Sequence, residues 1–118
     1  MSEKKLSYKE RFDEATRKDQ SSKIMAKYPD RIPIIVEPTK ESKLSLDKEK
    51  YLVPNDLTVG QFIFVIRKRM QLNPTKAIFL FVNNTMPSSS MLVSNVYEQN
   101  KDKDGFLYIS VTGENTFG

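Results

Sequence analysis

Two residue types that carry much of protein chemistry are missing from this 118-residue sequence, which contains no cysteine and no histidine. Without cysteine the chain can form no disulfide and no thiolate metal site. Without histidine it lacks the commonest metal ligand and the commonest general base. Ser–His and Cys–His catalytic pairs are excluded, so we expect a protein that is not an enzyme and that uses no metal or cofactor.

Long apolar segments are also missing. The longest apolar run, residues 77–82, is far shorter than the ~20 residues that cross a membrane. The N-terminus lacks the apolar stretch of a signal peptide. We therefore expect a cytoplasmic protein that reaches a membrane only through an attached lipid or a partner.

The length and composition suit a single globular domain, with 38% apolar and 29% charged residues. The net charge is +4, and its positive excess lies in residues 1–69, which favours acidic partners. Lysine and arginine are not clustered densely enough to indicate a nucleic-acid-binding protein.

Residues 7–27 are expected to be helical. Ser7 and Glu10 match the Ser-x-x-Glu capping box that opens a helix, and apolar residues then recur at helical spacing as far as Lys27. Tyr28-Pro29 ends the segment, because the residue before proline is disfavoured in the α region. The pattern fits either one long helix or two short helices with a break near residues 19–22.

A second capping box, from Thr58 to Gln61, opens the main helix, which is expected to run to Met70. Phe64 and Val65 fall outside its apolar stripe, so the helix is more apolar than one core-facing side requires. The stripe comprises Val59, Phe62, Ile63, Ile66 and Met70.

Four segments read as strands: residues 31–38, 48–54, 77–82 and 106–112. The second suits a sheet edge, because it alternates lysines with apolar residues and closes on Pro54. The third is continuously apolar, which indicates a strand covered on both faces. A short helix over residues 91–99, capped from Ser88–Ser90, separates the last two. This order predicts an α+β protein of β-grasp fold, in which one central helix crosses a four-stranded mixed sheet whose most buried strand comes late in the chain.

Acidic residues offer little sign of catalysis or metal binding. Asn100, Asp102, Asp104 and Gly105 match the start of a calcium-binding EF-hand loop, but its twelfth position is Val111 where a glutamate is needed. The glycines are too scattered for a phosphate-binding loop. We interpret the carboxylates of the loops and of the edge as solvated charges; they are Glu41, Asp47, Glu49, Asp102 and Asp104.

Two surface features allow both a structural and a functional interpretation. Arg67-Lys68-Arg69 is either a solvated last helical turn, where cations complement the helix dipole, or a contact for an acidic partner. The edge strand beside Phe62 and Val65 is either ordinary rim and core, or a groove to which a peptide adds as a strand.

The chain ends in a polar tail, residues 114–118, whose last two residues are Phe117 and Gly118. Glycine approaches other backbones closely, so a terminal glycine suits a protein modifier that is threaded through an enzyme and joined to an amine. The alternative is an incidental terminus without such a role.

Several segments together resemble the autophagy ubiquitin-like modifiers, above all the branch of the GABA-receptor-associated protein, over residues 8–118. These segments are Tyr28–Glu37, Lys50–Pro54, Leu57–Phe62, Ile66–Arg69, Phe81–Asn84 and Leu107–Ile109. The resemblance implies a ubiquitin-like core at residues 28–113, two N-terminal helices within residues 1–27 and a conjugation tail at residues 114–118.

The resemblance also implies a function. Family members are activated by an E1-like enzyme, transferred by an E2-like enzyme and linked through the terminal glycine to phosphatidylethanolamine on autophagosome membranes. A cysteine protease processes the tail and removes the lipid. Cargo receptors and adaptors then bind through a short aromatic-x-x-aliphatic motif, often preceded by acidic residues. A non-conjugated peptide-binding adaptor for trafficking is the alternative.

Residue by residue, the resemblance implies four groups. An aromatic pocket would be lined by Ile24, Pro33, Lys50, Leu52 and Phe106. An aliphatic pocket would be lined by Tyr51, Val53, Pro54, Leu57, Phe62, Val65 and Ile66. Acidic groups of the peptide would be met by Arg31, Lys48 and Arg69. Gly118 would be conjugated, and Phe117 would help the protease recognise the tail. The chain departs from the family at Gln20, where many members have an acidic residue. Many members are also made with extra residues after the glycine, whereas this sequence ends at Gly118, as either a mature or truncated form or one encoded with the glycine exposed.

Overall fold

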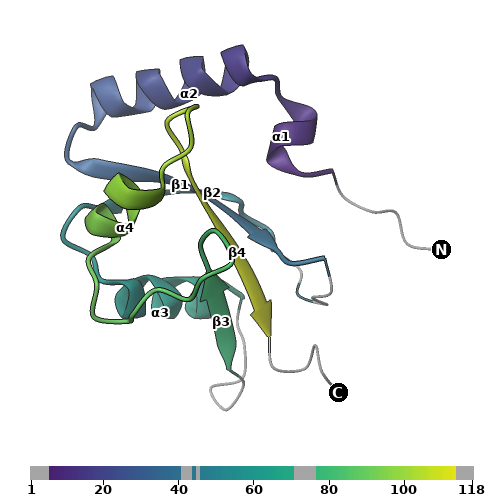
Figure 1. Ribbon diagram of the computed structural model, residues 1–118, viewed down its shortest axis with the longest axis vertical. Coiled ribbons are helices and arrows are strands. Elements are labelled where there is room, and N and C mark those ends of the chain that lie inside the picture. The colour runs from purple at the N-terminus through teal and green to yellow at the C-terminus, as the bar shows by residue number, and fades with distance from the viewer. Residues whose placement is uncertain (1–5, 41–43, 45, 71–76, 114–118) are drawn as a thin grey trace.

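Four strands form one mixed sheet at the centre of the protein (Figure 1). The computed structural model describes residues 6–40, 44, 46–70 and 77–113. The strands are β1 (Arg31–Pro38), β2 (Lys50–Pro54), β3 (Ile78–Phe81) and β4 (Leu107–Gly113), in the order β2-β1-β4-β3. β1 pairs antiparallel with β2 and parallel with β4, and β3 pairs antiparallel with β4. This arrangement, with its long crossover between two parallel central strands, confirms the predicted ubiquitin-like β-grasp fold.

The helices lie on both sides of the sheet (Figure 1). They are α1 (Tyr8–Arg11), α2 (Glu14–Lys27), α3 (Val59–Met70) and α4 (Val93–Asn100). α1 and α2 cover one face, whereas α3 and α4 contribute to the apolar core on the other. No helix of the described residues is long and apolar enough to cross a membrane.

The main core lies between α3 and the sheet. Val59, Phe62 and Ile66 are buried, and Ile63 and Met70 pack against them, so the predicted apolar stripe of α3 is confirmed. Alternate strand residues complete this core because successive side chains of a strand point to opposite faces. The strand residues are Ile32, Ile34, Val36, Tyr51, Val53, Ile78, Leu80, Leu107, Ile109 and Val111.

Local hydrogen bonds explain where the first helices begin. Ser7 and Glu10 make both bonds of the predicted capping box of α1. Phe12 is extended, and the Asp13 side chain then accepts from the Thr16 N–H at 2.9 Å to open α2. There are thus two helices, but the break expected near residues 19–22 is wrong. The break lies earlier, at Phe12 and Asp13, because the Asp13 side chain caps a new helix there; α2 is continuous across residues 19–22.

Two further expectations are wrong. The strand expected to be covered on both faces, residues 77–82, is instead the edge strand β3, because β4 lies between it and β1. Its residues alternate between buried and half-buried, whereas the central strands β1 and β4 each have five buried residues. The serines before α4 do not cap it. Leu92 occupies the N-cap without a side-chain bond, while the hydroxyls of Ser88 and Ser90 contact each other at 3.0 Å.

Candidate functional site

The outer edge of β2 is open in the part of the chain that the structure describes, as the sequence predicted for this strand. The Val36 N–H donates to the carbonyl of Glu49 at 2.8 Å. Hydrogen-bonded and non-hydrogen-bonded pairs alternate along an antiparallel ladder. With this register, the N–H and C=O groups of Lys50 and Leu52 point away from β1. They form an unpaired hydrogen-bonding edge that an extended peptide could join.

The residues of the predicted aromatic pocket all lie on the α2 side of this edge. Pro33 and Leu52 are direct neighbours across the β1–β2 pair. Ile24 of α2 packs against a small buried cluster that contains Phe106. The ammonium of Lys50 lies 5.8 Å from the ring centroid of Tyr8, which belongs to the same cluster. The structure therefore brings residues from α2, β1, β2 and the start of β4 together.

Tyr8 is a residue of this region that the sequence did not reveal. It has no exposed surface, and its ring meets Phe106 edge-on with centroids 5.7 Å apart. Its N–H donates to Glu37 at 2.7 Å, and its hydroxyl donates to Gln20. The only signal for this position in the sequence is an aromatic residue directly after the capping Ser7. The Tyr8 ring thus lies beside the Lys50 ammonium, and its hydrogen bond to Gln20 connects it to α2.

Apart from Pro54, which ends β2, the residues of the predicted aliphatic pocket lie on the opposite face, between β2 and α3. Val65 is 39% exposed, Leu57 is half-buried and Pro54 is exposed. Phe62 and Ile66 have no exposed surface, and Tyr51 and Val53 are only 5% exposed. The four buried residues thus pack beneath the surface of this site, and a ligand could contact Val65, Leu57 and Pro54 directly.

Tyr51 connects the edge strand to α3. Its ring packs edge-on against Phe62 with centroids 5.5 Å apart, and the Lys48 ammonium lies 4.8 Å from its centroid. Its hydroxyl oxygen is buried without a hydrogen-bond partner in the described structure. Burial raises the pKa of this phenol. An unsatisfied buried hydroxyl costs about 1–3 kcal/mol of stability.

The three basic residues expected to meet acidic groups are distributed along the edge. Arg31 is exposed and lies opposite Pro54 at one end of β2, whereas Lys48 precedes the other end. Arg69, in the last turn of α3, pairs with Asp47 at 3.3 Å. An acidic peptide residue would have to compete with Asp47 for Arg69, but this pair is exposed and weak.

The interpretation of all the loop carboxylates as solvated charges is wrong for Asp104, whose side chain has no exposed surface and pairs with Arg17 at 2.6 Å. Asp102 pairs with Lys9 at 2.7 Å, and Glu49 with Arg11. Glu41, Phe117 and Gly118 lie outside the described residues, so the predicted conjugation tail has no structural description.

An open-edged mixed sheet crossed by one helix, with two further helices ahead of it, defines a ubiquitin-like protein of β-grasp fold. The chain belongs to the Atg8 family of autophagy proteins, because the family model described as "Autophagy protein Atg8 ubiquitin like" matches residues 16–118.

Curated relatives and solved structures agree with this assignment. The chain is 59% identical over 103 residues to autophagy-related protein 8e of Arabidopsis thaliana, covering 86% of this chain and 84% of the relative. It is 54% identical over 112 residues to autophagy-related protein 8 of Schizosaccharomyces pombe, covering 94% and 93%. The crystal structure of Trypanosoma brucei ATG8 matches with a TM-score of 0.91 at 44% identity, over 98% of this chain and all (100%) of that one. Plasmodium falciparum Atg8, solved in complex with a Plasmodium falciparum Atg3 peptide, matches with a TM-score of 0.84 at 34% identity, over 92% and 96%.

Proposed function

We propose that this protein is a conjugated scaffold of autophagy that binds short peptides. Gly118 is linked to phosphatidylethanolamine on autophagosomal membranes, and the edge of β2 recruits receptors and adaptors that carry an aromatic-x-x-aliphatic motif. The free protein is cytoplasmic. Its other partners are E1-like and E2-like enzymes and a cysteine protease that processes the tail. The observation that carries the peptide-binding part is the open edge of β2 between apolar residues on opposite faces of the sheet.

The spacing of the motif follows from strand geometry. In an extended peptide, side chains three positions apart point to opposite faces because the side-chain period is two. A peptide paired with Lys50 and Leu52 would therefore direct its aromatic residue towards Ile24 on the α2 side. Its aliphatic residue would point towards Val65 on the α3 side. A two-position spacing would place both side chains on one face.

The basic residues around the edge explain why acidic flanks would help. Arg31, Lys48 and Lys50 are exposed near the two ends of β2. Opposite charges at the rim of an interface speed association and guide orientation more than they increase affinity. The Plasmodium relative was solved with a peptide of another protein, Atg3, which supports peptide binding as a property of this fold.

The first experiment measures peptide affinity by calorimetry. A peptide with an acidic flank and an aromatic-x-x-aliphatic motif should bind, and a version with one intervening residue removed should bind at least tenfold more weakly. Leu52→Ala should cost about 1–3 kcal/mol of binding free energy, because it truncates an apolar contact beside the paired edge.

The matched control is Leu92→Ala, which makes the same change at an exposed residue of the segment before α4. It should leave peptide affinity unchanged. Equal affinities for the two peptide spacings, or no loss with Leu52→Ala, would contradict the edge-pairing mode.

The second experiment tests conjugation. The chain is incubated with family E1-like and E2-like enzymes, ATP and liposomes that contain phosphatidylethanolamine. A lipidated species should form with the wild type and be absent with Gly118→Ala. If wild type and variant behave alike while motif peptides still bind, the protein is instead a non-conjugated adaptor for trafficking.

A further inference from the structure

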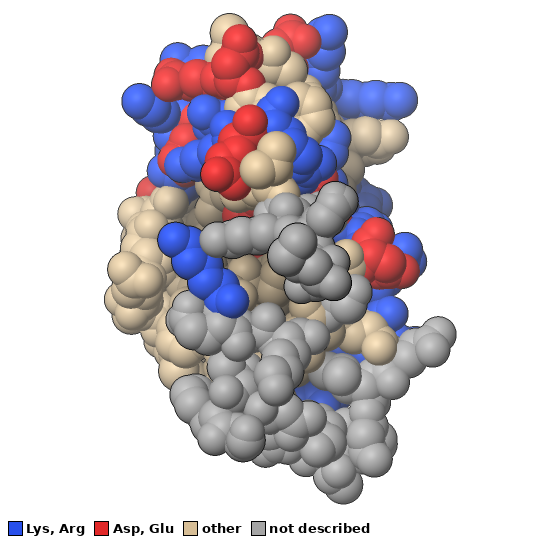
Figure 2. Space-filling model, turned by 90° about the vertical axis from the view of Figure 1, so that its right-hand side faces the viewer, with Lys and Arg blue, Asp and Glu red and all other residues tan. Residues whose placement is uncertain are grey.

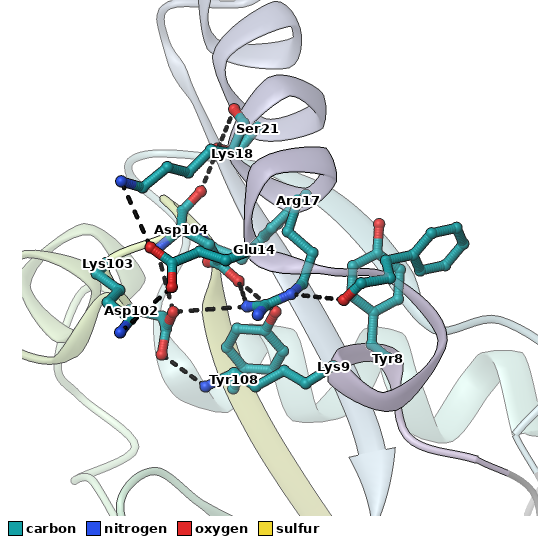
Figure 3. Close-up of polar contacts among 12 residues, drawn as sticks. Tyr8, Lys9, Glu14, Arg17, Lys18, Ser21, Asp102, Lys103, Asp104 and Tyr108 are labelled. Atoms are coloured by element: carbon teal, nitrogen blue, oxygen red, sulfur yellow. Dashed lines mark hydrogen bonds and ion pairs between the residues drawn. The ribbon is translucent and has the colours of Figure 1, made fainter.

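Asp104, in the loop between α4 and β4, is not one of the predicted peptide-binding residues, yet it makes several hydrogen bonds to other segments. Its side chain has no exposed surface. One carboxylate oxygen accepts from Arg17 at 2.6 Å and from the Tyr108 hydroxyl at 2.5 Å. The other accepts from the Phe106 N–H at 2.8 Å. The carboxylate thus holds α2 and the start of β4 at the same time (Figure 3).

The backbone around Asp104 also contacts α2 directly. The Ser21 hydroxyl donates to the Asp104 carbonyl at 2.5 Å. Gly105 follows with φ +95°, a conformation that glycine adopts readily. A Cβ at this position would collide with the Ser21 hydroxyl oxygen. The helix and the loop therefore approach so closely that a side chain does not fit between them.

These contacts connect two segments that carry residues of the predicted aromatic pocket. Phe106 lies two residues after Asp104, and Ile24 lies one helical turn after Ser21. Phe106 and Ile24 both pack in the cluster of Tyr8 and Ile35. The distance between the Phe106 wall and the Ile24 wall therefore depends on how firmly Arg17 and Ser21 hold the loop.

The loop has its own supports, whereas α2 has few. The Asp102 N–H donates to the Phe106 carbonyl at 2.8 Å, and the Tyr97 hydroxyl donates to the Gly105 carbonyl at 2.7 Å. The only buried residues of α2 are Arg17 and Ser21. If the contacts of Arg17 and Ser21 with Asp104 were weakened, we expect α2 to move, while these supports keep the loop and Phe106 in place.

We propose that Asp104 is a positioning residue that sets the width of the aromatic pocket, and thereby the size of the aromatic side chain that the pocket accepts. The inference rests on the proposed peptide-binding function. A firm Asp104 contact keeps α2 close to β4 and favours a phenyl ring over a larger indole. A loosened contact lets α2 move outwards and removes this discrimination.

The loop also provides a matched control. Lys103 pairs with Glu14 at 3.3 Å, which joins the same loop to the same helix, but Lys103 is exposed. Neither Lys103 nor Glu14 belongs to the cluster that contains Ile24 and Phe106. Lys103→Ala therefore removes an α2-to-loop contact without touching the buried one.

The test compares two peptides that differ only in phenylalanine or tryptophan at the aromatic position. Their Kd values are measured with wild type, Asp104→Asn, Ser21→Ala and Lys103→Ala. Asp104→Asn should shift the ratio of the two Kd values by about fivefold towards tryptophan. Ser21→Ala should shift it in the same direction by less, and Lys103→Ala should not shift it. A third peptide with alanine at the aliphatic position should bind more weakly by the same factor with wild type and with every variant.

The outcomes separate the inference from the proposed function. No binding by wild type would overturn peptide binding itself. Wild-type binding with an unchanged ratio in Asp104→Asn, or an equal weakening of both peptides, would overturn the role of Asp104 in pocket width. If Asp104→Asn does not fold, Ser21→Ala decides, since it removes only the hydroxyl that bonds the Asp104 carbonyl and leaves every charge in place.

Discussion

α2 and α3 pack on opposite faces of one sheet by different chemistry. α3 buries Val59, Phe62 and Ile66, whereas the buried residues of α2 are Arg17 and Ser21. Figure 2 shows basic and acidic side chains crowded together in its upper part, where α1 and α2 lie. Apolar burial is non-directional and is not weakened by electrostatic screening, whereas exposed ion pairs contribute little and are screened by salt.

This difference divides the protein into a fixed part and an adjustable part. α3 belongs to the cooperative core, so its loss is expected to unfold the sheet. α1 and α2 are expected to open locally at a lower free energy, because fewer apolar contacts hold them. The adjustable part carries Ile24 and Tyr8 beside the β2 edge, so local opening would change ligand binding before it changes the fold.

The largest effect is expected from Phe62→Ala. Phe62 has no exposed surface and packs against Tyr51. Truncating a buried phenylalanine costs about 3–5 kcal/mol, which urea unfolding should register as a lower midpoint. Phe64→Ala on the same helix is the control; Phe64 is 62% exposed, so its loss should change stability by less than about 0.5 kcal/mol. Similar losses for both variants would mean that α3 is not part of the core.

Arg17→Ala comes next, because it leaves the buried Asp104 carboxylate without its cation. Removing one partner of a buried pair costs about 3 kcal/mol or more. The loss should appear as faster hydrogen exchange in α2, while the amides of α3 keep their protection. Uniformly faster exchange in both helices would show that the two regions unfold together.

Acidification should loosen α2 before α3. Hydrogen bonds from Thr16 hold the pKa of Asp13 below its ordinary value. Burial alone would raise the pKa of Asp102, but Lys9 and the Asp104 N–H outweigh it, so the net shift is downwards. A carboxyl group whose pKa is lowered in the folded state contributes its full stabilisation of that state above its unfolded pKa, about 4. The contribution is lost as the pH falls through the lower folded pKa.

Amide exchange measured from about pH 5 down to about pH 2 would follow this loss. Protection in α2 should fall first, with α3 retained until lower pH. If α2 and α3 lost protection at the same pH, or if α2 became more stable on acidification, the division into a fixed and an adjustable part would be contradicted.

The smallest effect is expected from Lys9→Ala. Lys9 is 48% exposed at its side chain and pairs with Asp102 at 2.7 Å. Such pairs contribute about 0.2–1 kcal/mol. The difference between variant and wild type should disappear in high salt, as measured by thermal unfolding at two salt concentrations. A difference that persists in high salt would assign Lys9 a packing role instead, through its contact with the Tyr108 ring.

The sequence predicted those features whose signals are local. The Thr58 capping box and the stripe from Val59 to Met70 are contained within one helix, and α3 has the bounds they predict. The alternation of Lys50 to Val53 already separates residues for the two faces of the β2 edge. Both patterns depend on neighbouring residues only, so no tertiary information is required.

The features that the sequence did not reveal depend on distant residues. Asp104 lies among solvated charges in sequence, and its burial follows from Arg17, which is 87 residues away. Residues 77–82 read as a covered strand, but β3 is an edge because of the strand order. Tyr8 becomes part of the site only because α1 folds back onto Glu37.

The parallel pairing of β1 with β4 has a mechanical consequence. β4 lies between β1 and β3, and it ends at Gly113 on the same end of the sheet as Pro38. Tension applied to Gly113 along β4 would act parallel to the strands and load the hydrogen bonds of both ladders together, in shear. Under such a pull the central strands β1 and β4 would resist the force, and the edge strand β2 would lie outside the loaded ladders.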